Sequence, residues 1–588
     1  MFGKIIGIDG NTVTMINLQK KAEIRLINYH VIFLQESTKF VGVISDINED
    51  YVKVTLIGEI VNDTFISGVI KKPNLESSCR IINKPELEYI LGSQDYTSKN
   101  NLLVGNSTIY DNFKVTIKKD DFLGNHFAVL GNTGSGKSCA VARLLQNMFY
   151  YNDAGAPKSA HVVIFDAFGE YDSAMQDISK QPNLKYKKYV CSKSNALNNE
   201  DLLRLPVYFL DVQDLALLLD ADSLELIPVI ENTLRITYIF TSKDEKIKEY
   251  QNNIIARSLQ DILSSGKPAN QIADQIIAVL TNFNTNELNL NSIISQPGYD
   301  RTLRQCLNIN EQGKMPAINL VVDYLTKFTK LDTDSININK EFIYTLEDLY
   351  KALEFSLINE GILSSDAKFD KLNSLKVRLR SIINSENKEI FNYDGIISKP
   401  DYVKKFFTTS NGECAQIVDI NFDEIDERFA KTLTKIFSKL FFNFVTNLEE
   451  RTSFPIHIII EEAHRYVQND NDVNIIGYNI FEKIIKQGRK YGLLMGLITQ
   501  RPSELSTAVL SQCSNFIVLR LYHPEDLNIV LSLSTVVTVD TEEKMKVLHP
   551  GMALCFGNAF KVPTVVKFEL PNPMPKSSSL KVSEMWYR

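Results

Sequence analysis

Two stretches of the chain carry residues whose types and spacing suit chemistry on a phosphate. The first reads Gly131-Asn132-Thr133-Gly134-Ser135-Gly136-Lys137-Ser138-Cys139 and follows an apolar run, Phe127 to Leu130. Glycines at these positions let successive backbone N–H groups curve around an anion, and the helix expected to follow adds its positive N-terminus. In such a loop Lys137 reaches the β- and γ-phosphates, and the Ser138 hydroxyl takes one Mg²⁺ position. The stretch therefore predicts a binding site for ATP and Mg²⁺.

The second stretch is an apolar run, residues 456–460, that ends in Glu461 and Glu462. A phosphate loop needs carboxylates from a neighbouring strand, because one completes the Mg²⁺ shell and another orients the attacking water. We expect Glu461 to be a Mg²⁺ ligand together with Ser138, and Glu462 to be the catalytic base. An apolar strand that ends in acids is common by itself, so this prediction depends on its combination with the phosphate loop.

Other polar residues stand at the ends of expected strands and helices. Gln500 follows the apolar run 493–498, where it could sense a γ-phosphate at the carboxyl end of a strand. Asp166 and Glu170 follow another strand, so they lie near the nucleotide or merely cap the next helix. Arg489 belongs to a basic cluster near the end of a helix expected over 480–490, a position that favours basic residues in any case.

A parallel α/β sheet is needed to bring these residues together. From about residue 100 strands, loops and helices alternate, which is typical of such a sheet. The residues before it form short alternating stretches separated by turns, typical of a small β-barrel that serves as an assembly collar or, less readily, binds oligonucleotides. Helix-period segments such as 215–226, 247–263 and 346–357 predict a helical insertion, and an apolar stripe over 429–448 predicts a core helix.

These patterns divide the chain into five parts. We expect a β-barrel over residues 1–95, the first part of an ATPase core over 96–190, a helical insertion over 191–405, the second part of the core over 406–570, and a C-terminal tail over 571–588. The tail is rich in proline and serine, and we expect it to be extended and to dock on a neighbouring subunit.

Composition narrows the functional classes. With 588 residues, 44% hydrophobic and 23% charged, the chain is globular, and its net charge of −7 excludes a broad basic surface. Contact with DNA would therefore need a local basic lining, such as a pore. The seven cysteines and seven histidines show no metal-binding spacing, which indicates reduced thiols and no zinc site. No run is apolar enough to span a membrane, so we expect a cytoplasmic protein with no membrane contact.

In this order the motifs resemble the HerA family of hexameric DNA translocases and helicases, in the HerA/FtsK group of RecA-like P-loop ATPases. The resemblance is carried by residues 126–138, 166–171, 461–464, 488–492 and 499–505. It implies a RecA-like core and a six-membered ring, with duplex DNA through its centre and ATP at the subunit interfaces. It also implies that Arg489 completes the neighbour's site and that Gln500 is the sensor. Glu461 departs from the aspartate usual in this group, and Asn125 and His126 stand where the family often has arginine.

The resemblance also implies a protein partner. HerA proteins of this kind act with a NurA nuclease in archaeal recombination repair, or with nucleases and sirtuin-like NAD-consuming effectors in bacterial anti-phage defence. Two functions stay open: a duplex-DNA translocase or helicase, and an ATP-binding platform that organises an effector without moving DNA. The acidic net charge favours the platform, whereas the full set of hydrolysis residues favours the motor. The loops after Asp166 and over 465–474 are candidates for a pore lining, although the sequence favours solvated connectors for both.

Overall fold

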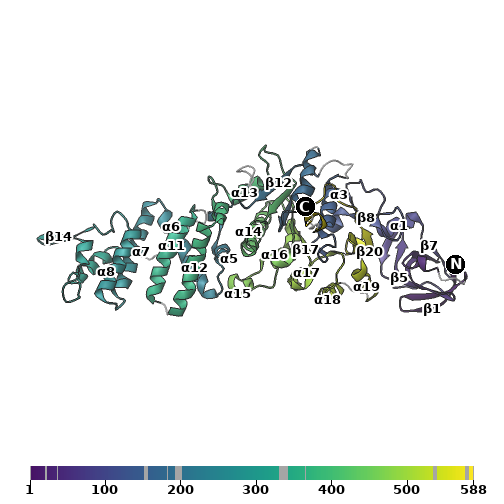
Figure 1. Ribbon diagram of the computed structural model, residues 1–588, viewed down its shortest axis with the longest axis horizontal. Helices are drawn as coiled ribbons and strands as arrows, with labels where there is room; N and C mark the ends of the chain where they lie inside the picture. Colours follow the sequence, from purple (N-terminus) through teal and green to yellow (C-terminus); the bar gives the residue numbers. More distant parts are fainter. Residues whose placement is uncertain are drawn as a thin grey trace.

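The computed structural model describes residues 2–19, 23–35, 38–150, 157–181, 183–192, 202–329, 342–363, 366–533, 539–576 and 582–586. The molecule is elongated: a small N-terminal sheet lies at one end, a large sheet with its helices in the middle, and a group of helices at the other end (Figure 1). Within the described ranges, no helix combines the length and the apolar character needed to cross a membrane.

The N-terminal part is an antiparallel sheet. Its strands are β1 (Phe2–Asp9), β2 (Thr12–Asn17), β3 (His30–Gln35), β4 (Thr38–Ile47), β5 (Tyr51–Val61), β6 (Thr64–Ser67) and β7 (Ser78–Ile81). They follow the order β1-β2-β5-β4-β3-β7, with β6 beside β5. Buried and half-buried residues alternate along all of β5, because one face of the sheet covers a core. Helix α1 (Lys84–Leu91) then starts at a capping box made by Asn83 and Glu86.

The large sheet has the order β12-β15-β11-β16-β17-β10-β18-β19-β20-β8-β9. Its parallel strands are β12 (Tyr186–Val190), β15 (Ile417–Asn421), β11 (Val162–Asp166), β16 (Ile456–Ile460), β17 (Leu493–Thr499), β10 (Phe127–Leu130) and β18 (Asn515–Val518). Antiparallel strands extend it: β19 (Met552–Gly557), β20 (Phe560–Lys567), β8 (Asn101–Ser107) and β9 (Lys114–Lys118). The predicted α/β class is confirmed.

Helices cover both faces of this sheet. Helix α3 (Lys137–Tyr150) packs on one face with Val162 and Ile164, and α14 (Glu427–Thr446) packs on the other with Val163 and Phe165. Burial on both faces explains why the parallel strands are almost continuously apolar. The shorter helices around the sheet are α2 (Lys119–Leu123), α4 (Asp172–Met175), α15 (Asp472–Ile476), α16 (Ile480–Gln487), α17 (Thr507–Leu510), α18 (Pro524–Ser532) and α19 (Val539–Val547).

Between β12 and β15 the chain is mainly helical and projects away from the sheet (Figure 1). Its helices are α5 (Val212–Leu218), α6 (Ile227–Thr241), α7 (Glu245–Leu263), α8 (Ala269–Asn282), α9 (Leu303–Cys306), α10 (Ile318–Thr326), α11 (Leu346–Leu363), α12 (Asp366–Asn384) and α13 (Lys399–Phe406), with a hairpin of β13 (Ile293–Gln296) and β14 (Tyr299–Thr302). Residues such as Ile255, Ile276 and Phe355 give this part a core of its own.

One local prediction was wrong. A single helix over 215–226 does not form, because α5 ends at Leu218 and Asp220 has a left-handed φ of 49° that breaks the helical path. Residues 572–576 of the tail lie against α3 and the segment after β11 of the same chain, and the docking of the tail on a neighbouring subunit stays a prediction. Near the end the chain forms a short helix, α20 (Val582–Met585), and is not extended throughout.

Candidate functional site

The phosphate loop lies between β10 and α3, with its backbone fixed by glycine. Gly134 and Gly136 have φ values of 72° and 98°, a left-handed conformation that favours glycine. A Cβ on Gly131 would lie 2.8 Å from Cβ of Leu519, so crowding restricts that position as well. Ser135 Oγ donates to the Asn132 carbonyl at 2.7 Å, and Lys137 Nζ donates to the same carbonyl at 3.3 Å. The loop is therefore folded around its own lysine.

A serine and a buried carboxylate meet at the start of α3. Ser138 Oγ donates to Glu461 Oε1 at 3.0 Å, whereas Oε2 of Glu461 is buried without a hydrogen-bond partner. Burial raises the pKa of Glu461 well above its usual value, and the nearby charges of Asp166 and Glu170 raise it further. An unpaired carboxylate oxygen beside a hydroxyl fits Mg²⁺, which prefers oxygen ligands and would favour the ionised carboxyl.

The described residues contain no group of three His, Cys, Asp or Glu side chains that could hold a metal ion by themselves. Mg²⁺ commonly binds through one or two protein groups, water and the phosphates of its nucleotide. Ser138 and Glu461 fit that role as the two protein groups, and the ion would neutralise charge on the transferring phosphoryl group.

Glu462 has an unusual backbone conformation. Its φ of 47° and ψ of 46° are left-handed, which costs about 1–3 kcal/mol for a residue other than glycine and is found mainly at functional sites. Its Oε2 lies 3.3 Å from His464 Nδ1 but makes no hydrogen bond of acceptable geometry. Burial raises the pKa of Glu462, and the nearby Lys137 opposes that shift. A raised pKa suits a carboxylate that must accept a proton near neutral pH.

Strand β17 separates the phosphate loop from the two glutamates. The expectation that β16 is the immediate neighbour of β10 was wrong, because β17 pairs with both strands. Glu461 and Glu462 still reach the loop, since the carboxyl ends of parallel strands share one edge of the sheet. The intervening strand delivers Gln500 to the same edge, where its Oε1 accepts a hydrogen bond from the Thr133 hydroxyl.

Arg489 lies elsewhere. It is an exposed residue of the short turn Gly488–Tyr491, which precedes the amino end of β17. The seven residues of β17 separate this turn from Gln500, a length of roughly 20 Å for an extended strand. Burial lowers the pKa of His126, which stands just before β10, and the nearby charge of Arg489 lowers it further. Arg489 is thus at the opposite edge of the sheet from the phosphate loop of its own chain.

The segment after β11 also contributes to the site. Asp166 is fully buried and accepts hydrogen bonds from the backbone of Phe168 at 3.2 Å and of Tyr171 at 2.9 Å. It therefore caps the following turn, and its charge also reaches Glu461. Helix α4 has no side-chain hydrogen bond at its N-terminus, so Asp166 fixes the turn before that helix and does not cap it, and its place near the nucleotide stays a prediction. Tyr171 is also fully buried and was not singled out from the sequence, although the phenol follows directly after Glu170.

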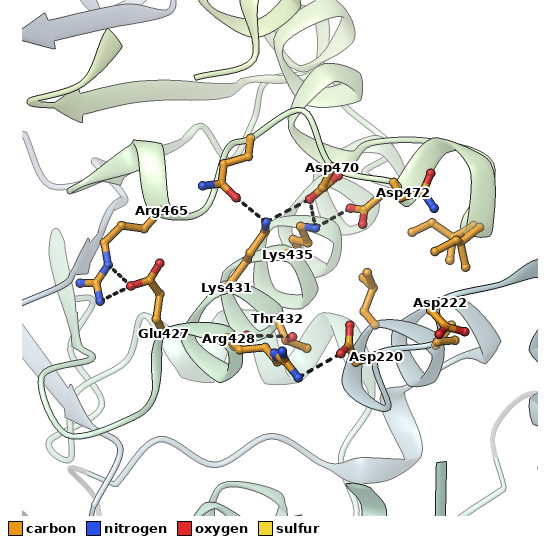
Figure 2. A pocket seen from close by; sticks show the side chains of 17 residues that line it. Asp220, Asp222, Glu427, Arg428, Lys431, Thr432, Lys435, Arg465, Asp470 and Asp472 are labelled. Atoms are coloured by element: carbon orange, nitrogen blue, oxygen red, sulfur yellow. Dashed lines mark hydrogen bonds and ion pairs between the residues drawn. The ribbon is translucent and has the colours of Figure 1, made fainter. Parts of the chain in front are cut away.

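A charged pocket of about 520 Å³ is lined in part by Arg465, which stands three residues after Glu462 in the sequence (Figure 2). Arg465 pairs with Glu427 at 2.8 Å. Lys435 of α14 lies 2.5 Å from both Asp470 and Asp472. Across the pocket Arg428 pairs at 3.0 Å with Asp220, at the base of the helical part. The loop over 465–474 is thus fixed to α14 and is not a free connector.

Comparison with known proteins shows which helicases the chain is similar to. The family model described as "Helicase HerA, central domain" matches residues 102–349. The chain is 26% identical over 557 residues to the probable helicase MJECL08 of Methanocaldococcus jannaschii, covering 93% of this chain and 83% of that protein. It is 24% identical over 587 residues to the probable DNA double-strand break repair helicase HerA of the same organism, covering 96% and 95%. Among solved structures, the plasmid coupling protein TrwB in complex with a non-hydrolysable ATP analogue aligns with 85% of this chain and 95% of its own, at 13% identity and a TM-score of 0.42.

The predicted relationship to the HerA helicases is confirmed by these matches. The chain is accordingly a P-loop ATPase whose cofactors are ATP and Mg²⁺. The roles assigned to individual side chains stay predictions.

Proposed function

We propose that this HerA-related ATPase assembles into a six-membered ring that hydrolyses ATP to move along duplex DNA. Similarity over nearly the whole length of a probable DNA double-strand break repair helicase supports the DNA-directed activity. The position of Arg489 supports the ring, because a rigid strand holds this arginine away from the phosphate loop of its own chain.

In this proposal the residues at the carboxyl edge of the sheet act on one nucleotide. The backbone of residues 131–136 and Lys137 hold the phosphates, while Ser138 and Glu461 hold Mg²⁺. Cys139, on the first turn of α3, lines the same end of the helix. Glu462 accepts a proton from the water that attacks the γ-phosphate, and the products are ADP and phosphate. Gln500, hydrogen-bonded to Thr133, reports whether the γ-phosphate is present.

The one observation that carries the proposal is the place of Arg489, which is exposed at the amino edge of the sheet, away from the phosphate loop of its own chain. The charges of Lys137, Arg465 and Arg501 act on Glu462 from within the same chain. In a head-to-tail ring the edge that bears Arg489 faces the nucleotide of the next subunit. An arginine supplied in this way makes hydrolysis depend on assembly.

The remaining parts of the chain serve the ring in this proposal. The strands within residues 1–95 form a small barrel that acts as a collar, and the helices within 191–405 are an insertion in a RecA-like core. The ring works with a separate nuclease, similar to NurA, or with a sirtuin-like NAD-consuming effector, in anti-phage defence or DNA end processing. The chemistry of the site supports this division, since it accounts for ATP hydrolysis and not for cleavage of DNA or NAD.

The test is steady-state ATP turnover of the purified chain against protein concentration, with and without linear duplex DNA. Turnover that rises with assembly and again with DNA is expected, and Glu462→Gln should abolish both increases. The second candidate is an ATP-binding platform that organises an effector, which the net charge of −7 favours because a DNA motor usually presents basic surface. A stable ring whose turnover ignores DNA would establish the platform and refute the motor.

A further inference from the structure

The segment after β20 crosses the helix that starts at the phosphate loop. Glu569 pairs with Arg143 of α3 and with Lys114 of β9. One turn further along α3, the side chain of Gln146 accepts a hydrogen bond from the Asn572 backbone at 2.8 Å. The same side chain donates to the Pro573 carbonyl at 2.8 Å. Residues 569–573 are thus attached to α3 at two successive levels.

The next residues attach to the turn after β11. Ser173 Oγ donates to the Met574 carbonyl at 2.8 Å, and the Lys576 backbone donates to the Glu170 carbonyl at 2.8 Å. Gln146 also donates to the Ala174 carbonyl at 3.0 Å, so one buried glutamine binds both the tail and the turn. The segment 569–576 therefore ties the phosphate-loop helix to the stretch that carries Glu170.

The turn that carries Glu170 has little room to shift. The Asp166 carboxylate fixes the turn by accepting two of its backbone N–H groups, and a Cβ on Gly169 would lie 2.6 Å from the Asn421 side chain. The Gln146–Ala174 hydrogen bond joins the end of the turn to α3, which begins at Lys137, and the charge of Glu170 acts on Lys137, Glu461 and Glu462.

We propose that residues 569–576 are a clamp that fixes the turn carrying Glu170 to α3, the helix that begins at Lys137, so that the Glu170 carboxylate keeps the position that ATP hydrolysis at this site requires. The inference rests on ATP hydrolysis at this site and is independent of any movement along DNA. It assigns Glu170 as a positioning residue and gives the end of the chain a role within its own subunit.

Two truncations form a matched pair for the test. A chain that stops after Lys576 keeps the clamp, and a chain that stops after Leu570 loses the contacts to Gln146, Ser173 and Glu170. Without DNA, we expect the longer chain to hydrolyse ATP at the full-length rate. We expect the shorter chain to lose roughly ten- to a hundredfold in kcat, as small misplacements of catalytic groups do, with KM for ATP nearly unchanged.

Combining the shorter truncation with Glu170→Gln separates a positioning role from general destabilisation. If the clamp acts through Glu170, the two changes are not additive, and the double variant is no slower than the slower single variant. A double variant whose loss in kcat equals the product of the two single losses would overturn the proposal. Equal rates of ATP hydrolysis for the two truncated chains would overturn it as well.

If the shorter chain fails to fold, Gln146→Leu in the full-length protein replaces it, because this change removes the side-chain contacts to both tail and turn. Gln181→Leu is its control, since Gln181 is exposed and lies outside these contacts. The same loss in kcat and the same non-additivity with Glu170→Gln are expected, and a wild-type rate for Gln146→Leu would refute the clamp. Failure of DNA to stimulate turnover would refute the motor and leave these comparisons intact.

Discussion

Replacing Arg489 by alanine should separate ATP binding from ATP hydrolysis. The exposed side chain lies at the amino end of β17, roughly 20 Å along an extended strand from the Gln500 end. Every group of its own phosphate site therefore stays in place, and ATP binding should be unchanged. In other P-loop enzymes an arginine supplied to the transition state contributes about 10³–10⁵ in rate, so turnover should fall by at least about 10³.

Mixing two inactive variants makes the prediction quantitative. In the proposed ring a working site needs Glu462 from one subunit and Arg489 from its neighbour, and a head-to-tail arrangement gives each site one such neighbour. In rings formed by co-expression of Arg489→Ala and Glu462→Gln chains in equal amounts, a random arrangement places the right pair at about a quarter of the sites. If each site hydrolyses ATP independently of the others, ATP turnover of the mixture should accordingly reach about a quarter of the wild-type rate.

The control is Lys490→Ala, because Lys490 is the next residue, equally exposed and also basic. It should hydrolyse ATP at the wild-type rate. A wild-type rate for Arg489→Ala would remove the assigned role, and a mixture no faster than its two components would show that Arg489 does not act across a subunit interface.

Three further substitutions follow from the site. Lys137→Ala should abolish tight ATP binding, measured by fluorescence with a labelled nucleotide, and retained micromolar affinity would contradict the phosphate-loop role. Glu462→Gln should bind ATP normally and lose about 10²–10⁴ in kcat, since it cannot accept a proton; an undiminished single-turnover rate would assign the base elsewhere. Arg465→Ala removes a partly exposed pair with Glu427, so unfolding free energy should change by no more than about 1 kcal/mol. Its kcat should still fall because the turn after Glu462 is released, and Glu427→Gln should do the same; a loss of thermal stability with no change in kcat would refute that coupling.

The residues expected to bind the nucleotide at the carboxyl edge of the sheet could be predicted from the sequence, because each belongs to a short motif of neighbouring residues. A glycine-rich loop with lysine and serine has few other uses after an apolar strand, and Glu461 and Glu462 end a run that could only be a buried strand. Since parallel strands place their carboxyl ends together, proximity followed without knowledge of the strand order.

Strand order itself was out of reach of such reasoning. Nothing in the residues of β17 says that it inserts between β10 and β16, because the pairing of buried apolar strands depends on the whole sheet. The left-handed backbone conformation of Glu462 could not be predicted from the sequence either, because glutamate rarely adopts a positive φ.

The contacts of residues 569–576 show a different limit. They join residues more than 400 positions apart, and apart from the ion pairs of Glu569 they do so through single hydrogen bonds to backbone groups, as between Gln146 and Pro573. A backbone carbonyl carries no sequence signature, and the proline-rich composition suggested only an extended tail. The helical part was predicted as helical from its periodicity, but its break at Asp220 depended on one backbone angle.

Strand β17 is buried along all seven residues, and Phe127 packs so closely on Gly496 that an added Cβ would meet its ring at 2.3 Å. Because the strand is packed this tightly, we expect a displacement of Gln500 at one end to move the turn of Arg489 at the other. If the two ends of β17 contact the nucleotides of successive subunits, this strand couples ATP hydrolysis at one site to hydrolysis at the next site of the ring. The packing of the strand, more than any loop, would then determine whether neighbouring sites hydrolyse ATP in sequence or independently.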